Sequence, residues 1–166
     1  MDAESVLEVL GGAFGLLRRE IESLSPEQLA WRPEQPVEWS VGEVANHATV
    51  AFFRQTYLIA NSNGLAWGEP PVGEVTDDSG LPGVEGLPKP AYAKPADFYL
   101  RAIDLSLARL RDLVSGLESR PLSESILDHR RHGLLRGGEW VAYVGYHTFT
   151  HMVEIRQRKA LPGFPG

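Results

Sequence analysis

Five histidines and no cysteine are the features of this sequence that most clearly limit its chemistry. Without cysteine, the chain has no thiolate nucleophile, no zinc–thiolate site and no internal redox pair. Any chemistry that needs a soft ligand or a nucleophile must therefore use histidine, carboxylate or a thiol supplied by a small molecule. His147 and His151 are four residues apart, which places both imidazoles on one face of a helix, one turn apart. This spacing allows both rings to face one metal ion.

The spacing of this pair leaves two interpretations open. His147 and His151 continue an apolar seam that includes Trp140 and Val144 and reaches Glu154, at positions where a helix bundle normally has Leu or Val. A histidine on such a seam is often a hydrogen-bonded core residue, but each buried ring needs partners for both of its nitrogens. Metal binding and a buried core pair are equally compatible with this pattern. Because no glutamate follows His147, the sequence gives no support for a zinc protease.

A metal centre needs a third ligand from another element. His47 lies between Val44 and Ala51 at helical spacings, so we expect it to border an apolar face and to look toward the interior. With His147 and His151 it would supply three nitrogen ligands from two helices and leave positions for water or substrate. Such a set suits Zn, Ni, Fe or Cu.

The remaining two histidines, His129 and His132, lie in a polar, glycine-flanked stretch beside Arg130 and Arg131. A solvated basic loop is the favoured interpretation of such a charge run. Contact of Arg130, Arg131 and Arg136 with a carboxylated thiol is the less favoured alternative.

Apolar periodicity and helix-capping signals predict the elements that position these residues. The predicted helices cover residues 3–24, 40–61, 96–117 and 139–159. Ser40 followed by Glu43 forms a capping box that marks the start of the second helix, and we expect the glycines of the first helix to permit a close helix crossing. Residues 26–39, 61–95 and 122–138 are predicted connectors. The Gly/Pro-rich stretch 61–95 is expected to cross the bundle and cover a pocket.

These elements predict an all-α protein, a four-helix bundle that forms a single domain over residues 1–166, with a long crossover between the second and third helices. The net charge of −6 and the pI of 5.4 make nucleic acid a poor partner. No apolar run approaches the length of a membrane span, and the N-terminus lacks the basic region of a signal peptide. We therefore expect a cytoplasmic protein that does not bind membranes.

Several short motifs resemble the DinB (DinB/YfiT-like) family. They are the segment from Leu29 to Pro33 (LAWRP), the segment from Trp39 to His47 (WSVGEVANH), the late His147-x-x-x-His151 and the ending Leu161-Pro162-Gly163. The resemblance also covers the helix order and the long crossover. It implies an up-down-down-up bundle, often dimeric, that binds one divalent metal ion through His47, His147 and His151. The crossover is longer than in a plain family member, which puts any inherited substrate in doubt.

Relatives in this family include bacillithiol-dependent thiol S-transferases and mycothiol-dependent isomerases of the maleylpyruvate type. The resemblance therefore implies a metal-dependent thiol S-transferase that acts on a small-molecule substrate. A metal-dependent hydrolase and a non-catalytic metal- or ligand-binding dimer linked to stress are the alternatives. Glu154 could hold a histidine tautomer or serve as a base, although an ion pair with Arg158 is favoured, and Tyr146 could orient substrate. The four tryptophans are expected to be packing anchors.

Overall fold

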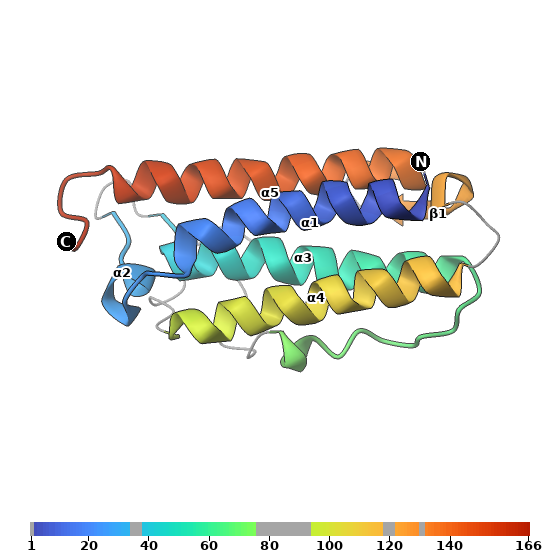
Figure 1. Ribbon diagram of the computed structural model, residues 1–166, viewed down its shortest axis with the longest axis horizontal. Helices are drawn as coiled ribbons and strands as arrows, with labels where there is room; N and C mark the ends of the chain where they lie inside the picture. The colour runs from blue at the N-terminus through green and yellow to red at the C-terminus, as the bar shows by residue number, and fades with distance from the viewer. Residues whose placement is uncertain (1, 34–37, 76–93, 118–121, 130–131) are drawn as a thin grey trace.

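Four long helices form a bundle, accompanied by one short helix and a two-stranded hairpin (Figure 1). The computed structural model describes residues 2–33, 38–75, 94–117, 122–129 and 132–166. The helices are α1 (Ala3–Ile21), α2 (Pro26–Ala30), α3 (Val41–Ser62), α4 (Ala96–Gly116) and α5 (Gly137–Lys159). In Figure 1, α1 and α5 run in one direction and α3 and α4 run in the other, which is the up-down-down-up arrangement. The predicted four-helix bundle is confirmed.

The core joins all four long helices. α1 packs against α5 and α4, and α3 packs against the same two helices from the other side. Phe14 of α1 stacks on Phe52 of α3 with ring centroids 4.7 Å apart, and Phe52 stacks in turn on Trp140 of α5 at 6.1 Å. All three rings are buried, so this aromatic stack fixes the separation of α1, α3 and α5.

The start of α3 follows directly from its sequence. The backbone N–H of Glu43 donates to Ser40 Oγ at 3.2 Å, and the backbone N–H of Ser40 donates to Glu43 Oε2 at 2.6 Å. Both partners are buried, so this capping box satisfies amides that water could not reach. It therefore sets the first turn of the helix that carries His47.

The two predicted connectors on either side of the bundle contain regular structure. Residues 26–39 include α2, which begins at Pro26 behind a capping box formed by Ser25 and Gln28. Residues 122–138 include a 3-10 turn, η3 (Leu122–Glu124), and an antiparallel hairpin of β1 (Ile126–His129) and β2 (Gly133–Arg136). These elements have three to five residues each, too few for their burial to show a period.

Two predictions that involve glycines are wrong: the close crossing at the first helix, and the end of the connector at residue 138. Gly11, Gly12 and Gly15 have no heavy atom within 4 Å of the position of an added Cβ, so they do not permit a close helix crossing. Gly137 begins α5 instead of closing a loop, and an added Cβ there would lie 1.7 Å from the backbone oxygen of Leu122. This glycine lets the chain before the hairpin pass directly over the start of α5.

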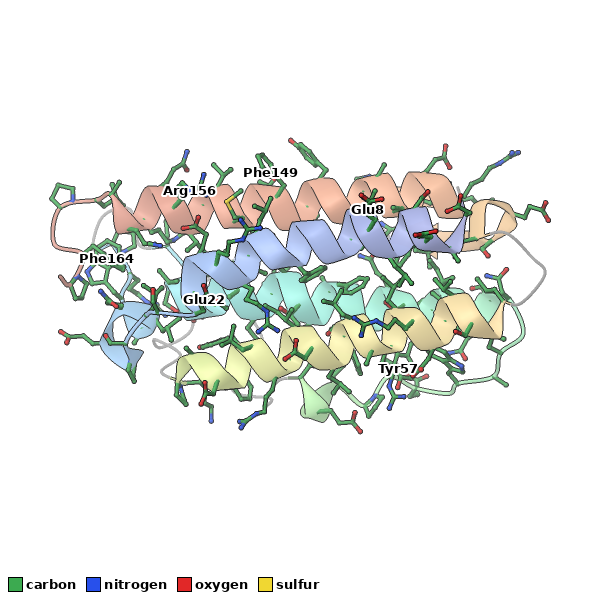
Figure 2. All side chains as sticks on the ribbon, viewed as in Figure 1. Glu8, Glu22, Tyr57, Phe149, Arg156 and Phe164 are labelled. Carbon is green, nitrogen blue, oxygen red and sulfur yellow. The ribbon has the colours of Figure 1, made fainter. Side chains whose placement is uncertain are left out.

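Charged side chains also tie α1 to α5. The carboxylate of Glu20 accepts hydrogen bonds from Arg156 Nε at 3.0 Å and from Lys159 Nζ at 3.0 Å; Arg156 is labelled in Figure 2. Burial alone would raise the pKa of Glu20, but these hydrogen bonds and the two positive charges hold the pKa below its usual value. Among the described residues, no helix is both long and apolar enough to cross a membrane.

Candidate metal centre

A cavity of about 1140 Å³ is lined by residues of α3, α5 and the hairpin. α3 contributes a strip from His47 through Ala51 to Gln55, and α5 contributes a strip from Tyr143 to Glu154. Residues of each strip recur every three or four positions, so each strip is one face of its helix. All five histidines of the chain line this one cavity.

Three of these histidines form the candidate metal centre. His47, His147 and His151 each offer one ring nitrogen, and the three nitrogens lie within 4.8 Å of one another. The ring centroids are 5.3 Å apart for His47 and His147, 5.0 Å for His47 and His151, and 4.4 Å for His147 and His151. The structure therefore brings together the three histidines that the sequence singled out as ligands.

The geometry of the α5 pair fits one metal ion. His147 Nε2 and His151 Nε2 are 3.2 Å apart. Two nitrogens that each lie about 2.0–2.1 Å from a tetrahedral zinc ion are separated by about 3.3 Å. The separation of the two nitrogens is therefore compatible with one shared ion.

Glu154 orients one of these rings. Its Oε2 lies 2.5 Å from His151 Nδ1, so His151 carries its proton on Nδ1 and presents the lone pair of Nε2 to His147. Burial opposes ionisation of Glu154, but the hydrogen bond from His151 and nearby positive charge, that of Arg158 included, hold its pKa below the usual value. A carboxylate hydrogen-bonded to the second nitrogen of a histidine is typical of histidine metal sites, where it fixes the tautomer that can bind the ion.

The favoured pairing of Glu154 with Arg158 is wrong. Arg158 instead donates from Nε to the backbone oxygen of Trp39 at 2.9 Å and pairs with Glu38 at 3.0 Å. The two side chains are one turn apart, but Arg158 belongs to the buried face of α5 whereas Glu154 lines the cavity. Helical spacing alone did not separate these two directions.

The predicted apolar seam of α5 is correct only in its first half. Trp140 and Val144 are buried, but the buried face then continues through Thr148, Met152 and Ile155. His147 and His151 lie beside this face and are only partly buried. The histidines therefore do not replace core residues; they form the edge of α5 that faces the cavity.

His47 lies on the opposite wall of the cavity, on α3. It is partly buried, and its ring centroid is 4.9 Å from that of Trp39, which also lines the cavity. The prediction that His47 borders an apolar face is confirmed by its buried neighbours Val44 and Ala48. Trp39 is therefore the tryptophan that forms part of the site, whereas Trp31, Trp67 and Trp140 pack against other aromatic rings.

The prediction that His129 and His132 belong to a solvated basic loop is wrong for His129, which ends β1 and is partly buried, whereas His132 is exposed in the hairpin turn. Hairpin formation turns both rings toward the cavity, where they stack at 4.8 Å and meet the edge of Tyr143 at 5.0 and 4.8 Å. His129 Nε2 also lies 3.5 Å from Gln55 Nε2. Arg130 and Arg131 lie outside the described residues, and Arg136 does not line the cavity.

The sequence did not single out several cavity residues, among them Arg54 and Gln55. Gln55 accepts a hydrogen bond from the indole nitrogen of buried Trp140 at 2.9 Å, which ties α3 to α5 beneath the cavity. Both follow His47 by about two helical turns, and this spacing was the available signal. Tyr146 lines the cavity as well, but its side chain is 72% exposed and so marks the mouth of the cavity.

The described part of the crossover lies away from this site. Val75 is buried against Val50 and Phe53 of α3 and Ala102 of α4, and its backbone oxygen accepts from Asn46 Nδ2 at 3.2 Å. No described crossover residue lines the cavity. The predicted cover over a pocket otherwise concerns residues 76–93, which lie outside the described residues.

Fold and site together define a class: helical bundles in which three histidines from two helices could hold one metal ion. A family model of the DinB superfamily matches residues 13–155, and the chain belongs to this superfamily. The matched segment includes all three candidate ligands. Comparisons with curated proteins and with solved structures found no match.

Proposed function

We propose that this protein is a divalent-metal-dependent enzyme that transfers a small-molecule thiol to an electrophilic substrate. The observation that carries the proposal is the convergence of His47, His147 and His151 on one point in a cavity of about 1140 Å³. Three protein ligands leave coordination positions for a small molecule, as in catalytic metal sites. Imidazole donors suit Zn, Ni or Fe.

The chain's own residues have distinct tasks in this proposal. When bound, the ion lowers the pKa of a coordinated thiol so that thiolate exists at neutral pH. His47, His147 and His151 would hold the ion, and Glu154 keeps His151 in the required tautomer. Tyr146, at the cavity mouth, has a phenol that orients the incoming substrate. The chain has no cysteine, so the sulfur must come from the small molecule.

The test combines metal analysis with a transfer assay. Purified protein is assayed for bound metal and then for the reaction of mercaptohexanol with chlorodinitrobenzene. The thiol sulfur bonds to the ring carbon, chloride leaves with the bonding electron pair, and the thiol proton passes to solvent. We expect turnover that requires both thiol and metal. This turnover should be lost in the double variant His147→Ala/His151→Ala.

The other outcomes point to other functions. Ester or amide cleavage that needs metal but no thiol would indicate a hydrolase. Histidine-dependent metal binding without either activity would indicate a non-catalytic binding protein. A homodimer and a cytoplasmic location stay predictions; sedimentation velocity measures the first.

A further inference from the structure

We propose that the hairpin end of the cavity is a carboxylate-binding subsite, formed by Arg54 with His132, that selects thiols or electrophiles carrying a negative charge. The inference rests on the proposed function, because it names the chemical class of molecule that reaches from the metal centre to this end.

The position follows from contacts between α3 and the hairpin. Gln55, next to Arg54 in sequence, approaches His129, and His129 stacks on His132. The His132 backbone N–H also donates to His129 Nδ1 at 3.3 Å, which holds the two hairpin residues together. Arg54 and His132 both line the cavity, and the backbone of Arg54 is one residue from that of Gln55, so we assign both to the hairpin end.

Within the part of the chain that the structure describes, no carboxylate balances the charge of this end. Arg54 is exposed and makes no hydrogen bond or ion pair with any of the residues that the structure describes. Among the described residues that line the cavity, Glu154 is the single carboxylate, and it is engaged with His151 at the metal end. A guanidinium without a partner, in a chain with net charge −6, is a ready bidentate donor for a carboxylate.

The length follows from the helix. Arg54 is seven residues beyond His47 on α3, a rise of about 10 Å along the axis. On α5, Tyr143 lies eight residues before His151, a rise of about 12 Å in the same direction because the helices are antiparallel. Ala51 and the ring of Tyr143 line the cavity between the two ends. The small side chain of Ala51 leaves room for a ligand. The cavity thus suits an extended molecule with a thiol at one end and an anion at the other.

The test compares mercaptohexanoate with mercaptohexanol, which differ only in the terminal carboxylate. Binding to zinc-loaded protein is measured by calorimetry for the wild type, Arg54→Gln, and Arg111→Gln as the matched control. Arg111 is exposed on α4, and its replacement removes the same charge outside the cavity. We expect wild type and control to prefer the carboxylate about tenfold, and Arg54→Gln to lose this preference while keeping its affinity for the alcohol.

A second arm separates this subsite from the thiol chemistry. Hexanoate and hexanol, which lack the thiol, are titrated into metal-free protein while nitrogen-edited NMR follows the Arg54 side chain. A shift of the Arg54 Nε–H signal with hexanoate alone supports the subsite even if no thiol binds, in which case only the proposed thiol transfer fails. Equal binding of acid and alcohol in both arms, or a preference unchanged in Arg54→Gln, overturns the subsite even if thiol transfer occurs.

Discussion

Removal of the carboxylate of Glu154 should weaken metal binding without removing a ligand. His151 can bind an ion through Nε2 only while its proton is on Nδ1, and Glu154 Oε2, 2.5 Å from Nδ1, holds it there. In Glu154→Ala this tautomer is no longer selected, and the negative charge that balances the ion is lost. Partners of this kind typically contribute 10- to 100-fold to metal affinity.

The exposure of Glu154 sets the expected magnitude within that range. Its side chain is 38% exposed, so water screens its charge and replaces part of its hydrogen bonding. We therefore expect the lower half of the range, about 10- to 30-fold weaker binding, or about 1.4–2 kcal/mol. Glu154→Gln should fall between wild type and Glu154→Ala, because the amide oxygen can still accept from Nδ1 but carries no charge.

The assay is a zinc titration in competition with a chromophoric chelator at constant pH and ionic strength. Glu8→Gln is the matched control, since Glu8 is an exposed carboxylate on α1 (Figure 2) outside the cavity. If Glu154→Ala binds zinc as tightly as wild type, or if Glu8→Gln loses as much affinity, the assigned role of Glu154 is refuted. Loss of binding in His151→Ala confirms that the titration reports this site.

Two stability predictions follow from packing and charge. Gly137→Ala should destabilise the fold by about 3 kcal/mol, because the added Cβ meets a backbone oxygen that cannot move alone. Gly138→Ala is the control and should change stability little, because no heavy atom of a described neighbouring element lies within 4 Å of its added Cβ. Urea unfolding of both variants measures the difference. Glu20→Gln should lower stability by about 1 kcal/mol at neutral pH. Since the folded-state pKa of Glu20 is depressed, its contribution exists above its unfolded-state pKa and is lost as the pH falls through the folded-state pKa. Unfolding curves of wild type and variant should therefore converge on acidification, and a gap that persists at low pH would contradict the assigned cause.

Local signals in the sequence were sufficient to predict the two helices that carry His47, His147 and His151. The Ser40 capping box and the apolar period of the following residues set the start of α3, and with it the position of His47. The spacing of His147 and His151 is a property of any α-helix and needs no tertiary information. These signals depend on residues within one or two turns of a helix. Tertiary contacts do not alter them, so they can be read from the sequence.

Contacts between distant segments could not be predicted in this way. His129 approaches Gln55 across 74 residues of sequence, and only the hairpin brings the two together. The same hairpin carries His132 to the cavity, although its polar surroundings in the sequence indicate a solvated loop. Arg54 could not be predicted for a related reason. In the sequence it is one exposed arginine on a helix, and only the packing of α5 and the hairpin against α3 places it at a cavity.

The placement of the ligands beside the core, and not within it, separates the site from the stability of the bundle. The helices are held by the buried stack of Phe14, Phe52 and Trp140, while His147 and His151 lie at the edge of α5 next to the buried face. Substituting these histidines removes no core volume, so the large cost of a core cavity does not arise. Loss of metal or activity in such variants therefore reports on the site itself.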